Sequence, residues 1–240
     1  MADGLSRVTA AVTSAVTEPQ PEPPRQVVLA TAALALAFVA SRRLWPLART
    51  VITIAHEGGH ATAALLARRR LRGIRLHSDT SGVTLSHGRP SGPGMVFTAA
   101  AGYVAPSLAG VGYAALLWLD RITAALWLGI VLLALMLIAI RNVYGVVAVV
   151  GTAALIVGVA QFTEPRVQAG FAYGFAWFLL LGGVRPVFEL QRLRRLRLAP
   201  DSDADQLARL THVPGVLWVG WFALMTVGAA AAGAWLLVAA

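Results

Sequence analysis

Long apolar runs separated by short polar stretches dominate this chain. Seven runs have the length, close to or above about 18 residues, that lets a helix cross a bilayer. They lie at about residues 27–45, 46–67, 95–119, 122–140, 143–162, 167–184 and 214–237. The pattern predicts an all-α polytopic membrane protein with about seven transmembrane helices.

Two polar stretches break this helical pattern. After the second run, Ile74 and Leu76 and then Val83 and Leu85 alternate with polar residues around a Ser-Asp-Thr-Ser-Gly turn. Such alternation predicts an amphipathic β-hairpin over residues 74–87. Residues 185–213 are basic first and acidic later, and Ser202 or Asp201 would suit the N-cap of a short helix there.

The first 24 residues differ in composition from the rest. They are rich in Thr, Ser and Pro and end in Glu-Pro-Gln-Pro-Glu-Pro-Pro, which predicts a disordered tail over 1–24. We expect residues 25–240 to form a single membrane-embedded domain. It would have its core at about 46–185, a cytoplasmic loop at 185–213 and a final helix at 214–238.

The net charge is +9, and all twenty basic residues are Arg. A basic chain can bind nucleic acid, but membrane topology explains this charge better, so we expect no nucleic-acid partner. With seven crossings, fifteen Arg fall on the side of the N-terminus and five on the other. The positive-inside rule then predicts a cytoplasmic N-terminus and hairpin in a multi-pass cell-membrane protein, with Arg beside anionic lipid headgroups.

The candidate chemistry lies in the second run, as His56-Glu57-Gly58-Gly59-His60. Residues four apart share a face of a helix, so His56 and His60 can hold one metal ion. Glu57 lies beside them, where it can act as general base. This is the H-E-x-x-H arrangement of zinc peptidases, and ionisable residues inside a span usually serve function. The alternative is a pair of buried histidines bonded to neighbouring helices.

A catalytic zinc ion usually has three protein ligands, so a third must come from elsewhere in the chain. Because the chain has no Cys, Cys-ligated zinc and disulfides are excluded. We favour Asp203, at the start of the predicted short helix, with Asn142 as the alternative; a purely capping role for Asp203 is equally open. The other candidates on the same predicted side are Asp79, Glu189, Asp201, Asp205, His77, His87 and His212.

These features resemble the site-2 protease family of intramembrane metalloproteases. The resemblance rests on the motif inside a transmembrane helix, the hairpin that follows it and the small-residue-rich third run, over roughly residues 46–185. The whole chain is also similar to a bacterial subgroup close to this family. The resemblance implies zinc on His56 and His60 with Glu57 as the base. It also implies an Asp ligand in a later Asp-Gly motif, which this chain lacks; residues 141–145 and 181–185 come nearest to it.

Three functions are compatible with these residues. The first is a zinc endopeptidase in which Glu57 deprotonates a zinc-bound water and a transmembrane protein is the substrate. Its unwound segment would pair with the hairpin edge, represented by Ile74, Leu76, Val83 and Leu85. The second is a catalytically inactive membrane binding or scaffold protein that keeps the fold. The third is a metal transporter, which the presence of one ionisable cluster disfavours. The sequence does not indicate an oligomeric state.

Overall fold

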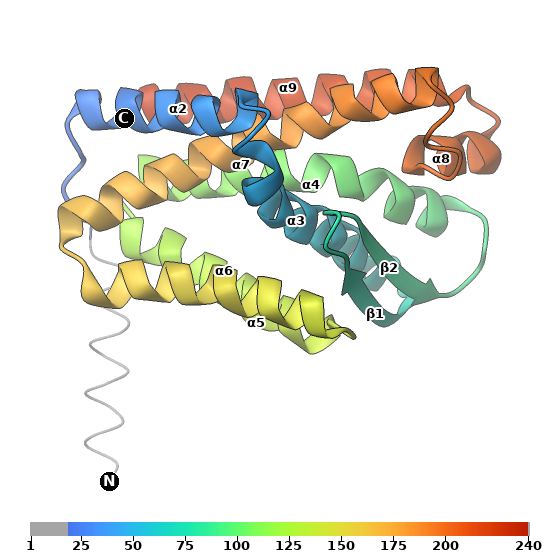
Figure 1. The fold of residues 1–240 in the computed structure, drawn as a ribbon, viewed down its shortest axis with the longest axis horizontal. Helices are drawn as coiled ribbons and strands as arrows, with labels where there is room; N and C mark the ends of the chain where they lie inside the picture. Colours follow the sequence, from blue (N-terminus) through green and yellow to red (C-terminus); the bar gives the residue numbers. More distant parts are fainter. Residues whose placement is uncertain (1–18, 240) are drawn as a thin grey trace, which may run out of the picture.

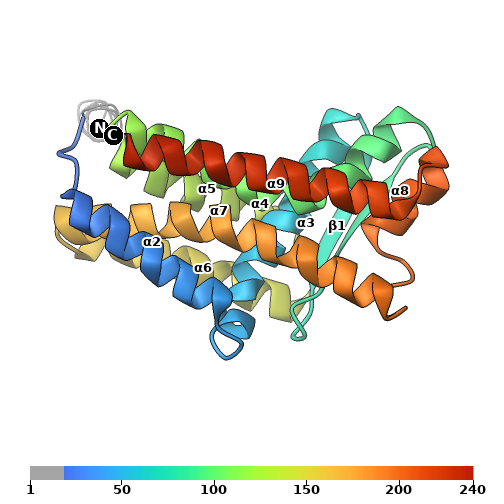
Figure 2. The same cartoon turned by 90° about the horizontal axis from the view of Figure 1, so that it is seen from above.

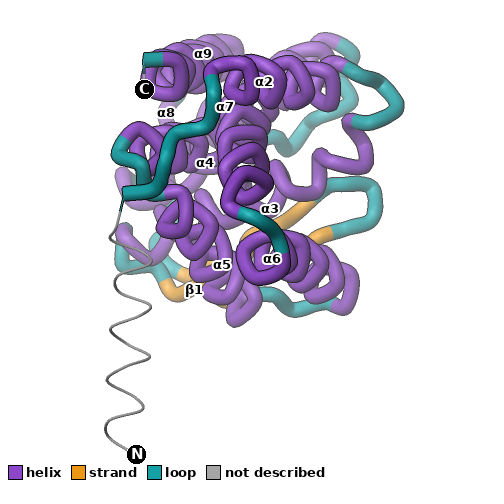
Figure 3. The backbone as a smooth tube through the Cα atoms, turned by 90° about the vertical axis from the view of Figure 1, so that its left-hand side faces the viewer, coloured by secondary structure: helices purple, strands orange, loops and turns teal. Residues whose placement is uncertain are grey.

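The computed structural model describes residues 19–239 as a bundle of helices with one small sheet (Figure 1). The two strands are β1 (Arg70–Leu76) and β2 (Gly82–His87), drawn in orange among the helices of Figure 3. The helices are α2 (Arg25–Ala40), α3 (Trp45–Leu66), α4 (Pro93–Trp118), α5 (Ile122–Ala139), α6 (Val143–Phe162), α7 (Pro165–Arg195), α8 (Asp203–Thr211) and α9 (Gly215–Val238). Most of the tail predicted to be disordered, over 1–24, lies outside the described residues.

The predicted apolar runs all become helices, but the count of seven crossings is not confirmed. Five described helices, α4, α5, α6, α7 and α9, are long and apolar enough to cross a membrane. The pair α2 and α3, which meet at a bend of 99°, makes the count six if the two helices form one broken span. α7 also continues beyond its predicted end to Arg195. An i,i+4 ion pair between Arg185 and Glu189 and three Arg in its last turn favour this extension.

The break between α2 and α3 has a local cause. Pro46 can occupy the first turn of a helix but has no N–H to continue one, so a new helix begins there. The last carbonyls of α2 then need donors inside an apolar bundle. The guanidinium of Arg185 donates to the carbonyls of Val39 and Ser41 and lies 4.8 Å from the Trp45 ring centre. A charged side chain of α7 thus stabilises the bend.

The described N-terminal residues lie at the end of the bundle opposite the hairpin. Gln20 donates its N–H to the carbonyl of Asp120 at 2.9 Å, and its side-chain oxygen accepts from Thr123 N–H at 2.6 Å. The α4–α5 and α6–α7 connections and the C-terminal end of α9 lie at this same end (Figures 1 and 2). The alternation of seven crossings, which placed residue 20 on the hairpin side, therefore does not match the fold.

The predicted hairpin is present and antiparallel, with Ile74 opposite Thr84 and Leu76 opposite Gly82. The outer edge of β1 is covered by the α5–α6 connection. Ile140 forms a parallel bridge with Ile74, and Arg141 N–H donates to the Ile74 carbonyl at 2.9 Å. Within residues 19–239, the outer edge of β2 forms no hydrogen bond with the backbone of another segment. The sheet therefore has one covered edge and one free edge.

Small residues let α3 and α4 approach closely. A Cβ on Gly59 would lie 3.0 Å from the carbonyl oxygen of Ala101 and would overlap the side chain of Ala105. Helices in membranes commonly pack through such small residues, which bring backbones together. α8 also packs on α4 and buries Ala204 and Leu207 in a core shared with α4, α7 and α9. α3 and α8, distant in sequence, thus pack on the same helix.

Candidate metal centre

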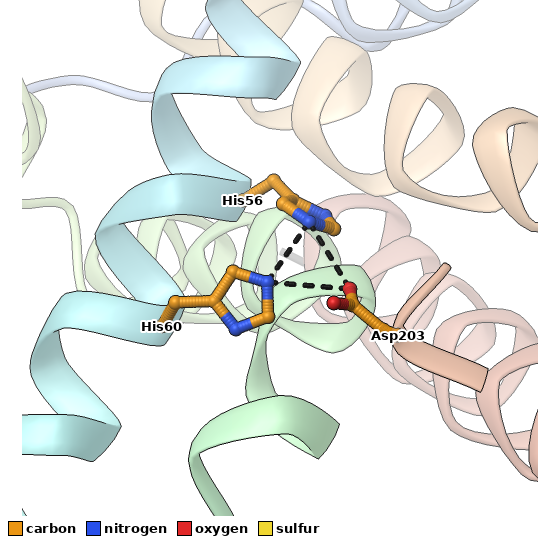
Figure 4. Close-up of side chains that lie close together, drawn as sticks. All are labelled: His56, His60 and Asp203. Atoms are coloured by element: carbon orange, nitrogen blue, oxygen red, sulfur yellow. Dashed lines mark hydrogen bonds and ion pairs between the residues drawn. The ribbon is translucent and has the colours of Figure 1, made fainter. Parts of the chain in front are cut away.

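α3 presents the two motif histidines to the interior of the bundle (Figure 4). Four residues make slightly more than one turn, so the imidazoles of His56 and His60 lie on one face of α3. Their Nε2 atoms are 3.1 Å apart. His60 is buried, and its Nδ1 lies 2.7 Å from the carbonyl oxygen of Thr98 on α4. The hydrogen bond to Thr98 therefore fixes the orientation of the His60 imidazole.

The third side chain of the cluster comes from α8. As predicted, the helix is capped: the Ser202 hydroxyl accepts from Asp205 N–H. Arg194 at the end of α7 ion-pairs with Asp205 and donates to the Ser202 hydroxyl at 3.2 Å. These contacts fasten the first turn of α8 to the end of α7, and the side chain of Asp203 in this turn points towards the histidines (Figure 4).

His56, His60 and Asp203 form the one group of potential metal ligands found in residues 19–239. Asp203 Oδ2 lies 3.3 Å from His56 Nε2 and 3.2 Å from His60 Nε2. Tetrahedral zinc with bonds of 2.0–2.2 Å separates its ligand atoms by about 3.3 Å. The three distances therefore fit a zinc ion with three protein ligands.

The chemistry of the donors supports the same conclusion. A backbone carbonyl can only accept, so His60 Nδ1 carries the proton of the bond to Thr98. In the neutral ring Nε2 is then a lone-pair donor. It faces His56 Nε2 and a carboxylate oxygen, and lone pairs at this separation need a shared proton or metal ion between them. A carbonyl that fixes the tautomer of a histidine ligand is typical of metal sites.

The charge state of Asp203 suits a ligand role. Burial opposes ionisation, but positive charge placed beside the carboxyl at His60 and hydrogen bonds from both imidazoles outweigh it and hold the pKa of Asp203 well below its ordinary value. A metal ion held by the same rings would act in the same direction. By contrast, Asp79 lies in the hairpin turn, where the hydroxyl and N–H of Ser81 lower its pKa. Asp79 thus caps a turn and does not belong to the cluster.

Gly102 on α4 leaves the space beside the histidines open. A Cβ built on this residue would lie 2.7 Å from His56 Nε2 and closer still to His60 Nε2. This is the side of the rings where a bound ion would contact them. The next residue, Tyr103, packs edge-on against His56, with ring centres 4.7 Å apart. α4 thus leaves room beside both imidazoles at Gly102 and packs Tyr103 against the ring of His56.

Glu57 is buried but lies outside the ligand cluster, next to the hairpin. The Thr84 hydroxyl donates to Glu57 Oε2 at 2.6 Å. Gly82 on the same strand is so close that a Cβ there would lie 2.6 Å from Glu57 Oε1. β2 therefore fixes the conformation of the carboxylate beside the metal centre.

The remaining predicted residues lie elsewhere. The Asn142 amide donates to the Leu76 carbonyl at 2.7 Å and accepts from Leu76 N–H at 3.2 Å, so Asn142 continues the sheet edge instead of reaching the histidines. Ile74 and Leu76 are 0% and 1% exposed, because they point into the core beneath the hairpin. Val83 and Leu85 are 38% and 48% exposed. Within the predicted edge, β2 alone offers apolar side chains to a partner.

Sequence reasoning missed three residues of this site. Thr98 acts through its backbone carbonyl, and Gly102 through the absence of a side chain, so neither has a chemical signature in the sequence. Thr84 looks like any strand Thr. A cluster of small residues, Ala99 to Gly102, was the one available signal, because it indicates a close helix contact.

Comparison with known proteins agrees with this geometry. A family model described as Peptidase M50B-like matches residues 29–233, which includes every residue of the cluster. No curated protein and no solved structure gives a significant match. The matched region covers most of the chain. The chain therefore belongs to the Peptidase M50B-like family, as its resemblance to the site-2 proteases predicted.

Proposed function

We propose that this protein is an intramembrane zinc endopeptidase that hydrolyses a peptide bond of a membrane-spanning protein. The main support is that His56 Nε2, His60 Nε2 and Asp203 Oδ2 lie 3.1–3.3 Å from one another, next to the buried Glu57. Family membership supports the same reaction. We propose His56, His60 and Asp203 as the zinc ligands, within one membrane-embedded unit over residues 25–240.

The residues of the chain divide the chemistry between them. A zinc ion held by the three ligands would supply Lewis acidity, which acidifies water and polarises a peptide carbonyl. Glu57 serves as general base: Oε2 is engaged by Thr84, which leaves Oε1 to accept the proton of the attacking water. The same carboxyl then returns the proton to the leaving amide nitrogen. The Thr98 carbonyl keeps the His60 ring in the ligand tautomer.

The substrate segment has to be extended, because a helix hides its peptide bonds in internal hydrogen bonds. We propose that it adds to the free edge of β2, whose strand also contacts Glu57. Val83 and Leu85 would contact its side chains. The edge of β1 is already covered by residues 140–142 and would take no part.

We further propose that the hairpin end of the bundle faces the cytoplasm and that residue 19 lies on the opposite side. The support is again the positive-inside rule, applied to the observed arrangement. Three Arg lie at the other end of the described chain: Arg25, Arg121 and Arg166. Twelve lie at the hairpin end: Arg68, Arg69, Arg70, Arg72, Arg75, Arg89, Arg141, Arg192, Arg194, Arg195, Arg197 and Arg209.

Single cysteines test this orientation cleanly, since the natural chain has none. A membrane-impermeant maleimide added to intact cells should label Pro19→Cys and Glu164→Cys but label Ser78→Cys only after permeabilisation. The seven-crossing alternation instead places residues 19 and 78 on one side and residue 164 on the other. Shared labelling of Pro19→Cys and Ser78→Cys would therefore refute our orientation.

Metal removal tests the enzymatic proposal. We expect purified wild-type protein to carry about one zinc per chain, measured by mass spectrometry of the metal. Co-reconstituted, tagged single-span membrane proteins should be cut by this form. Cleavage should stop on treatment with a zinc chelator and return with added Zn²⁺, because the ligand set remains intact. His60→Ala should carry no zinc and cut nothing.

The scaffold reading makes a different prediction. A non-catalytic protein would leave every tagged candidate uncut, and its biological effect would survive in Glu57→Gln. Two results together would favour the scaffold role over our proposal: zinc-loaded wild-type protein cuts no candidate, and Glu57→Gln retains full function in cells.

A further inference from the structure

The hairpin strand β2 holds the carboxylate that the mechanism needs. Thr84 Oγ1 lies 2.6 Å from Glu57 Oε2 and 3.1 Å from the Glu57 backbone carbonyl. A hydrogen bond from a hydroxyl to a carboxylate is among the short, strong ones. Since Glu57 is buried, no bulk water competes for this bond. One hydroxyl thus fixes one of the two carboxylate oxygens.

A second contact on the same strand limits the carboxylate from another direction. A Cβ on Gly82 would lie 2.6 Å from both Cγ and Oε1 of Glu57 and 2.8 Å from Cδ. The Gly82 backbone has no left-handed conformation that would require glycine. Glycine is therefore needed here for the room that it leaves beside Glu57, and not for its backbone conformation. Gly82 and Thr84 thus contact the two oxygens of the Glu57 carboxylate from the same strand.

Resting on the proposed function, we propose that Thr84 is a positioning residue for the general base. Its hydroxyl holds Oε2, so that Oε1 is the oxygen that takes the proton, and Gly82 keeps the space for this arrangement. The free edge of β2 is also the edge that we propose for the substrate. A substrate strand paired with it would fix the position of β2, and β2 is the strand that aligns Glu57. Substrate binding and alignment of the base would thus be coupled through Gly82 and Thr84 of β2.

Cleavage kinetics give the first test. Thr84→Val keeps the shape but removes the donor, and we expect kcat to fall by about tenfold to a hundredfold, as for a misplaced catalytic group. KM and zinc content should stay unchanged, and Thr84→Ser should restore kcat. Gly82→Ala should also lower kcat, because its Cβ displaces the carboxylate. The control is Ser86→Ala, which removes a nearby hydroxyl of β2 that binds Arg69 at 3.1 Å instead of Glu57.

A stability measurement tests the hydrogen bond between Thr84 and Glu57 without any cleavage assay. Thr84→Val should lower the melting temperature in detergent more in the wild-type background than in the Glu57→Ala background, where the carboxylate is absent and the backbone carbonyl of residue 57 is the one acceptor left to the hydroxyl. Equal losses in both backgrounds, or a wild-type kcat for Thr84→Val, would overturn the positioning role. If the two residues are coupled in stability while wild type cuts no substrate, the proposed proteolysis fails and the contact stands.

Discussion

Glu57→Gln is expected to reduce peptide-bond cleavage by about 10²–10⁴-fold, the usual contribution of a general base. The amide has nearly the same shape, and its oxygen can still accept from Thr84, so the packing against β2 should persist. It cannot accept a proton from water at neutral pH. Since Glu57 lies outside the ligand cluster, zinc content should remain at the wild-type level.

The measurement combines cleavage rate and zinc content on the same preparations. Glu164→Gln is the matched control, because this residue is exposed at the opposite end of the bundle. It should behave as wild type in both assays. If Glu57→Gln instead loses zinc, Glu57 acts in holding the ion, and if it cuts at the wild-type rate, the base is a different group.

Gly102→Ala is expected to weaken zinc binding by about a hundredfold or more, although it changes no ligand. The added methyl would lie 2.7 Å from His56 Nε2 and nearer to His60 Nε2, so at least one ring has to rotate away. The helix itself should gain from the change, because Ala favours a helix over Gly by about 1 kcal/mol. Loss of zinc with retained folding would therefore come from the site alone.

Gly112→Ala on the same helix is the control. A Cβ at Gly112 meets no atom within 4 Å, so zinc content and melting temperature should match wild type or improve slightly. Zinc titration monitored by calorimetry and circular dichroism distinguishes the two variants. Wild-type zinc affinity in Gly102→Ala would mean that the ion, if bound, does not lie between these two imidazoles.

Local physics explains how much of the fold was predictable. A chain in a bilayer must satisfy its backbone hydrogen bonds internally, so an apolar run of sufficient length has to become a helix. The predicted ends of the runs at 122–140, 143–162 and 214–237 consequently agree with α5, α6 and α9 to within one residue. The alternation of Ile74, Leu76, Val83 and Leu85 gave the hairpin for a similar reason, since a strand alternates its faces.

Crossings were harder to predict than helices. Hydropathy alone cannot distinguish two spans from one bent span, because both halves of α2–α3 are apolar. The bend between these helices is stabilised by Arg185, which lies far along the chain and donates to carbonyls at the end of α2. Our proposed side for the N-terminal residues differs from the predicted one for this reason, because counting α2–α3 as one span reverses the alternation.

The sequence by itself determined that two imidazoles share one face of a membrane helix with a carboxylate beside them, because helical periodicity acts over four residues. Only the tertiary structure decided what converges on them. It brings Asp203 into the cluster, engages Asn142 at the sheet edge and lays Thr84 against Glu57. These contacts join segments that are far apart in the chain through single polar atoms. Which of several chemically equivalent acids or amides reaches the histidines is therefore set by helix packing and not by the local sequence pattern.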